Sequence, residues 1–85
     1  RENDDLFVPA LWNPKEIVAY SRQGYTDKSW QVPADWASVK QVTVQNITLQ
    51  GLASDKTTVP VIDGALRLTL KADQAVSIVP AVRRR

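Results

Sequence analysis

The chain has 85 residues, of which 44% are hydrophobic and 24% are charged, and its formal net charge is +2. These proportions exclude a disordered chain, and the length allows one domain with a small core. The sequence contains neither cysteine nor histidine, which excludes disulfides, thiolate zinc sites and nucleophilic catalysis that relies on a histidine base.

The first part of the chain predicts a short strand and then a hairpin. An apolar run covers Leu6 to Pro9, and a turn is expected at Trp12-Asn13-Pro14, where the proline restricts the backbone. The two strands of the hairpin are expected at Ile17 to Arg22 and at Lys28 to Val32. The loop between them contains Gly24, whose backbone tolerates the positive φ angles of tight turns.

The middle of the chain predicts one helical turn followed by the longest strand. A proline interrupts the strand pattern, and Asp35 is expected to cap a single helical turn that runs through Ala37 and Ser38. Val39 to Gln50 is the longest extended stretch, and apolar residues alternate with polar ones along it. The apolar residues stand at even positions in its first half, Val42 and Val44, and at odd positions in its second half, Ile47 and Leu49. Because strand side chains alternate between two faces, we expect a bulge or break near Gln45-Asn46.

The last third predicts a second hairpin and a closing strand. Thr57 to Ile62 and Ala65 to Lys71 flank Asp63-Gly64, a dipeptide that favours two-residue hairpin turns. The second arm has leucine at alternate positions, and Ala72-Asp73-Gln74 then connects it to a strand from Ala75 to Pro80. Six or seven short strands with closely spaced turns predict an all-β fold, a small antiparallel β-sandwich.

The ends of the chain set the predicted domain limits. We expect residues 1–5 to be a polar lead-in, residues 6–80 to be the single sandwich domain and residues 81–85 to be a basic tail. The tail holds three arginines, so the rest of the chain has no net positive charge and no nucleic-acid partner is expected. The sequence begins at Arg1 and contains no methionine, which predicts an excerpt of a larger protein. No apolar run reaches the roughly 18 residues of a membrane span.

The carboxylates predict structural roles. Asp27, Asp55, Asp63 and Asp73 are expected at turns, where aspartate hydrogen-bonds nearby backbone amides. No stretch has the alternating spacing of a calcium loop, so we expect no metal and no cofactor. Asn46-Ile47-Thr48 matches the N-glycosylation pattern but lies inside a predicted strand, which favours a chance match. The segment itself is predicted not to be an enzyme.

Five aromatic residues in the first half of the chain are the candidate site residues. They are Trp12, Tyr20, Tyr25, Trp30 and Trp36. One interpretation is a flat platform for sugar rings. The other places Trp30 and Tyr20 in the core, with Trp12 and Trp36 sealing a contact with an adjoining domain, because tryptophans dominate buried and interface area. Packing is the favoured interpretation, and the choice depends on which rings are exposed.

Turn and tryptophan motifs follow one another along nearly the whole chain. They are Leu6-Phe7-Val8-Pro9, Trp12-Asn13-Pro14-Lys15, Tyr20, Gly24, Ser29-Trp30, Val32-Pro33 with Trp36, Val39 to Gly51, Val59-Pro60-Val61, Asp63-Gly64 and Ala72 to Pro80. In this order they resemble a β-sandwich region that lies beyond the catalytic barrel of the large secreted endo-α-N-acetylgalactosaminidases.

The resemblance implies a parent enzyme, secreted or at the cell surface, that releases galactosyl-N-acetylgalactosamine from serine or threonine of mucin-type glycoproteins. Its catalytic carboxylates would lie in a separate barrel, so no catalytic residue transfers to this chain. The chain would be an accessory sandwich that packs against the catalytic domain. Two alternatives stay open: a carbohydrate-binding module that stacks Trp12, Trp30 or Trp36 on a sugar, and a cell-surface adhesion domain with a protein partner.

Overall fold

The computed structural model describes residues 5–81 and contains seven strands and one short 3-10 turn. In chain order these are β1 (Asp5–Ala10), β2 (Asn13–Ser21), β3 (Tyr25–Gln31), η1 (Ala34–Trp36), β4 (Gln41–Thr48), β5 (Gly51–Pro60), β6 (Ala65–Leu70) and β7 (Gln74–Pro80). Asp5 belongs to the first strand, while residues 1–4 of the predicted lead-in and 82–85 of the predicted tail lie outside the described residues.

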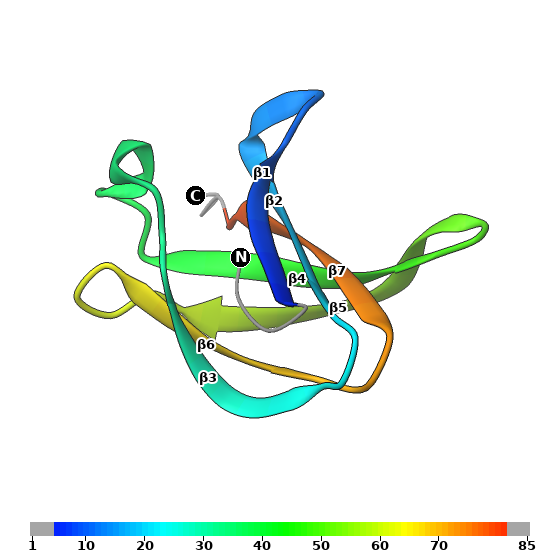
Figure 1. Ribbon diagram of the computed structural model, residues 1–85. Coiled ribbons are helices and arrows are strands. Elements are labelled where there is room, and N and C mark those ends of the chain that lie inside the picture. The colour runs from blue at the N-terminus through cyan, green and yellow to red at the C-terminus, as the bar shows by residue number, and fades with distance from the viewer. Residues whose placement is uncertain (1–4, 82–85) are drawn as a thin grey trace.

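The strands form two sheets that pack face to face (Figure 1). The larger sheet has five strands in the order β1-β2-β7-β4-β5, and the smaller sheet consists of β3 and β6. All of these strand pairs are antiparallel. The predicted all-β class and small antiparallel β-sandwich are therefore confirmed.

The core lies between the two sheets because each strand turns alternate side chains inward. In β6, Leu66, Leu68 and Leu70 are buried, whereas Arg67 and Thr69 between them are exposed. The opposite side of this core comes from three strands of the larger sheet and from η1. It consists of Ile17, Ala19, Val42, Val76, Ile78 and Trp36.

The predicted hairpin of Ile17 to Arg22 with Lys28 to Val32 is wrong. β2 pairs with β1 and β7 in the larger sheet, and β3 pairs with β6 in the smaller one. The chain crosses between the sheets at Gly24, which has a φ of +87°. A second crossing, from β6 to β7, passes close to Gly24. A Cβ at position 24 would come within 2.9 Å of Leu70 O and Ala72 N in that segment, so the close approach requires glycine.

The second predicted hairpin is correct at its turn and wrong in its strands. Ile62 and Ala65 exchange two backbone hydrogen bonds of 2.8 and 3.0 Å around Asp63-Gly64, and the two central residues have φ angles of 54° and 77°. Beyond this bridge the arms separate, because β5 continues in the larger sheet and β6 pairs with β3. The turn is therefore a corner between the sheets (Figure 1).

The middle of the chain matches its prediction in part. The longest strand is β5, with ten residues, whereas β4 has eight. The predicted break is confirmed where the ladder between β4 and β5 shifts register between Gln45 and Ile47. The single helical turn is present as η1, but its N-cap is Pro33, so the predicted cap by Asp35 is wrong. A backbone hydrogen bond from Trp36 N to Pro33 O closes the turn.

Substitution of Gly24 by alanine tests the crossover. Gly24→Ala combines the strain of a positive φ with the overlap of its Cβ with neighbouring backbone. Gly64→Ala has a similar φ, but its Cβ would meet nothing within 4 Å, which makes it a matched control. We expect Gly64→Ala to lower the free energy of unfolding by about 1–2 kcal/mol and Gly24→Ala to lower it clearly more, as measured by urea denaturation. Equal losses would contradict the close approach.

Candidate binding surfaces

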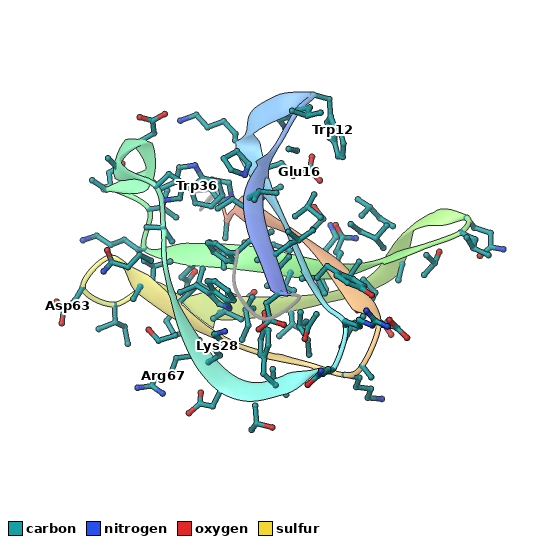
Figure 2. The ribbon with its side chains drawn as sticks, in the orientation of Figure 1. Trp12, Glu16, Lys28, Trp36, Asp63 and Arg67 are labelled. Atoms are coloured by element: carbon teal, nitrogen blue, oxygen red, sulfur yellow. The ribbon has the colours of Figure 1, made fainter. Side chains whose placement is uncertain are left out.

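The five aromatic candidates do not form one surface. Trp12 lies in the connection between β1 and β2, and 71% of its surface is exposed, whereas Trp36 is 1% exposed (Figure 2). Tyr25 and Trp30 lie together on β3, partly buried against the core. Tyr20 lies on β2 and donates a 2.6 Å hydrogen bond from its hydroxyl to an oxygen of Asp73. Trp36 is thus out of reach of a sugar or an adjoining domain, and Trp12 is the exposed tryptophan.

The β1–β3 seam, made of Asp5, Phe7, Tyr25, Lys28 and Trp30, joins an edge strand of each sheet. The rings of Phe7 and Trp30 stack with their centroids 4.9 Å apart. Trp30 Nε1 donates a 3.1 Å hydrogen bond to the Tyr25 hydroxyl. Lys28 Nζ lies 4.5 Å from the centroid of Trp30, a cation–π contact, and 3.0 Å from Asp5 Oδ2. The seam therefore holds β3 to β1 through side chains.

The seam shifts the pKa values of two of its groups. Asp5 is buried and accepts hydrogen bonds from Ser21 Oγ at 2.7 Å and from Lys28 Nζ at 3.0 Å. The bond from Ser21, followed by that from Lys28, holds the pKa of Asp5 below its ordinary value of 3.8. Burial raises the pKa of Tyr25 above its ordinary value of 10.0. The Asp5–Lys28 ion pair is therefore intact at neutral pH.

The Leu11–Trp12 tip, which connects β1 to β2, is exposed, and its tryptophan is hydrogen-bonded within the fold. Leu11 is fully exposed, and the ring of Trp12 is held by the carboxylate of Glu16. Trp12 Nε1 donates a 2.8 Å hydrogen bond to Glu16 Oε1, and Ser77 Oγ donates one of 2.6 Å to Glu16 Oε2. Glu16 on β2 therefore holds the Trp12 ring with one carboxylate oxygen and is itself held by Ser77 of β7 through the other (Figure 2). Sequence reasoning found Trp12 but missed Leu11 and Glu16, although an apolar pair beside an Asn-Pro turn was a visible signal.

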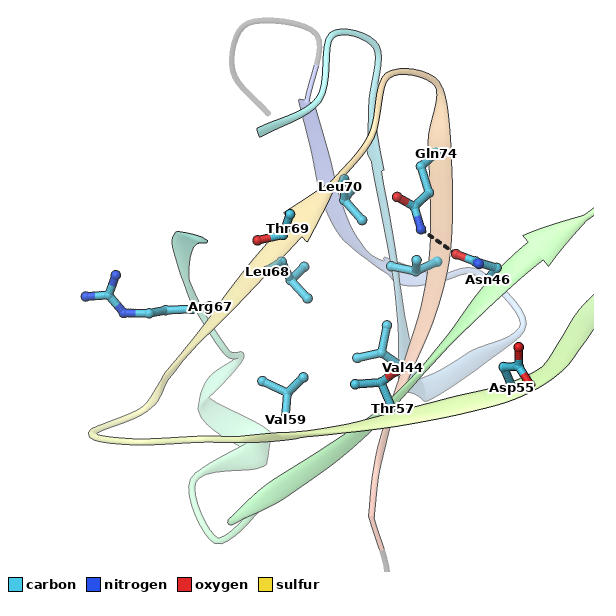
Figure 3. A pocket seen from close by; sticks show the side chains of 11 residues that line it. Val44, Asn46, Asp55, Thr57, Val59, Arg67, Leu68, Thr69, Leu70 and Gln74 are labelled. Carbon is cyan, nitrogen blue, oxygen red and sulfur yellow. Dashed lines mark hydrogen bonds between the residues drawn. The ribbon is translucent and has the colours of Figure 1, made fainter. Parts of the chain in front are cut away.

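A groove lies between β5 and β6, on the side of the sandwich away from the seam (Figure 3). We call it the β5–β6 groove, and its volume is about 290 Å³. Its floor is apolar, with Val44 from β4, Val59 from β5 and Leu68 from β6. None of the aromatic candidates lines it. The groove is therefore a second surface, separate from the Leu11–Trp12 tip.

The polar end of the β5–β6 groove corrects one prediction. Asp55, expected at a turn, lies within β5 and lines the groove. Gln74 Nε2 donates a hydrogen bond to Asn46 Oδ1 in the same wall (Figure 3). Sequence reasoning missed this pair because its members are 28 residues apart. Asp63 and Asp73 lie in turns, as predicted, and both have positive φ angles. Asp27, also expected at a turn, instead lies within β3 at a register shift in its ladder to β6, with a φ of 52°.

Several carboxylates are occupied by contacts within the fold. Asp5 pairs with Lys28, Glu16 accepts from Trp12, and Asp27 lies 3.1 Å from Arg67 Nη1. Residues 5–81 contain no group of three or more Asp, Glu, His or Cys side chains that could hold a metal ion. In that same part of the chain, no helix has the length and apolar character needed to cross a membrane. The geometry offers two surfaces for binding, the Leu11–Trp12 tip and the β5–β6 groove.

Comparison with known proteins adds no family to this description. No protein-family model matches the chain, and a search of curated proteins gives no match. The resemblance to endo-α-N-acetylgalactosaminidases therefore stays a prediction from the motifs. Functional inference rests on the two surfaces.

Neutralisation of Asp5 tests the ion pair of the seam. Because the native pKa of Asp5 lies below 3.8, its charge stabilises the fold above that pH, and the contribution is lost as the pH falls through the native pKa. We expect Asp5→Asn to lower the free energy of unfolding at neutral pH and to reduce the further loss on acidification below about pH 4.

Urea denaturation at several pH values measures both effects. Asp63→Asn is the control, because its exposed turn has a positive φ that aspartate and asparagine both tolerate. This control is expected to keep the stability and the acid dependence of the natural chain. An unchanged acid dependence in Asp5→Asn would contradict the contribution of the Asp5 charge.

Proposed function

We propose that the chain is a non-catalytic accessory β-sandwich that packs against a neighbouring domain through the Leu11–Trp12 tip. The observation that carries this proposal is an apolar tip whose tryptophan is exposed and yet held by Glu16. A large apolar side chain that a hydrogen bond already holds makes a good interface anchor, since less conformational entropy is lost when it binds. The tip therefore suits a hollow on an adjoining domain.

The neighbour is proposed to be the catalytic domain of a secreted glycoside hydrolase that acts on mucin-type O-glycans. Support for this identity comes from the motif resemblance to endo-α-N-acetylgalactosaminidases. The non-catalytic role is supported by a sequence without histidine or cysteine and by carboxylates that are bound within the fold, such as Asp5 and Glu16. In this role the sandwich buttresses loops of the catalytic domain.

The accessibility of Trp12 tests docking. In the isolated chain Trp30 is partly buried and Trp36 is buried, so we expect Trp12 to give most of the fluorescence that acrylamide quenches. Trp12→Phe is expected to remove that quenched fraction. The same measurement is made on the chain joined to the segment that its gene encodes before Arg1, where Trp12 is expected to be shielded. Undiminished quenching of Trp12 in the longer protein would contradict docking through the tip.

The upstream coding sequence and a sugar titration separate docking from its alternatives. A catalytic barrel encoded before Arg1 supports the glycoside hydrolase identity, whereas tandem β-repeats favour an adhesion protein. A carbohydrate-binding module is the second candidate, favoured by the open face of Trp12. If the tip binds a neighbouring domain and not a sugar, calorimetric titration of the isolated chain with millimolar galactose or N-acetylgalactosamine is expected to give no heat of binding. Saturable binding that is lost in Trp12→Ala would replace docking with sugar recognition.

A further inference from the structure

Three of the four sheet edges in the described structure carry features that hinder pairing with another strand. β1 has a register shift at Pro9 and an inward-facing charge at Asp5. β5 has a register shift in its ladder to β4 and ends at Pro60. β3 has a register shift that contains Asp27, whose φ is 52°. These strands are poorly suited to accept a neighbour.

The free edge of β6 has no such protection. Its six residues contain no proline and have no positive φ angle. In the antiparallel ladder between β3 and β6, residue pairs that exchange backbone hydrogen bonds alternate with pairs that do not. The hydrogen bond from Val32 N to Gly64 O shows which pairs are bonded. By this alternation, the backbone N–H and C=O groups of Arg67 and Thr69 point away from β3, and within residues 5–81 they have no backbone partner. β6 therefore offers free backbone donors and acceptors.

The β5–β6 groove lies beside this free edge (Figure 3). Val44, Thr57 and Val59 of the larger sheet project into it, while the Arg67 side chain points away. A second hollow of about 380 Å³ shares Val59 and continues to Ile62 at the corner between the sheets. Together the two hollows follow β6, whose six residues span about 20 Å. An extended occupant fits this shape.

We propose that one extended strand of another polypeptide pairs with the free edge of β6 and places alternate apolar side chains in the groove. The free backbone groups select a strand, and the valine and leucine floor selects apolar side chains on one of its faces. Asp55 stands at the polar end of the groove with no ion-pair partner among the described residues, so a lysine near one end of the strand complements it.

The larger sheet supplies one side of the groove through Val44, Thr57 and Val59, so a strand paired with β6 would also lie against the larger sheet of the same molecule. The site is also independent of the proposed docking function, because neither Leu11 nor Trp12 lines either hollow.

An NMR titration with a model strand tests this site. The probe is an acetylated and amidated peptide of alternating valine and threonine with a lysine at each end. The control peptide has proline in place of the central threonines. In the isotope-labelled chain, the first peptide is expected to shift the backbone amide signals of Arg67 and Thr69, and the control peptide is expected to leave them unchanged. Shifts confined to β1 or β3, or none at millimolar peptide, would overturn the proposal.

Two variants at position 67 separate backbone pairing from side-chain contacts. Arg67→Pro removes an N–H that points away from β3, whereas Arg67→Ala keeps it, and both lose the contact with Asp27. We expect Arg67→Pro to weaken peptide binding by on the order of tenfold and Arg67→Ala to leave it nearly unchanged. Equal affinities would overturn strand pairing.

The amide spectrum of each variant reports whether it is folded. If Arg67→Pro does not fold, the shift maps of the natural chain with the two peptides decide the question. N-acetylgalactosamine in a separate titration is expected to leave the signals of the groove unchanged. Shifts at Asn46 and Gln74 with the sugar, and none with the peptide, would assign the groove to glycans and overturn the proposal.

Discussion

Two strands, β3 and β6, have to cover the inner face of a sheet of five strands. The leucines of β6 pack on the middle strands of that face, and the β1–β3 seam extends the cover to β1 through the stacked rings of Phe7 and Trp30. In the described part of the chain no strand covers β5 in the same way, and the β5–β6 groove lies there. The unequal width of the sheets therefore sets a closed side and an open side of the sandwich.

The closed side depends on a small polar network. Burial of Asp5 alone would be unfavourable, but Lys28 and Ser21 both donate hydrogen bonds to it. The Ser21 hydroxyl also accepts a hydrogen bond from Gly24 N, so it links the first strand to the crossover between the sheets. Lys28 in turn lies over the Trp30 ring. One network thus fixes the position of β3, while the Leu11–Trp12 tip stays free to bind elsewhere.

Local patterns in the sequence predicted the turn at Asp63-Gly64 and the common face of the leucines in β6. The Asp63-Gly64 turn and the alternating leucines depend on neighbouring residues alone. Strand pairing was not predictable in this way, since alternation tells which face is buried but not which strand lies alongside. The exposure of Trp12 and the burial of Trp36 likewise depend on where the β1–β2 connection and η1 lie in the fold. No local pattern linked the distant residues that line the groove.

Amide hydrogen exchange along β6, followed by NMR in the free chain, tests the open side of the sandwich most directly. If β6 pairs only with β3, Leu66 and Leu68 exchange slowly, whereas Arg67 and Thr69 exchange faster, so protection alternates along one strand. Equal protection of all four amides would contradict an open edge, because it would require a second strand beside β6.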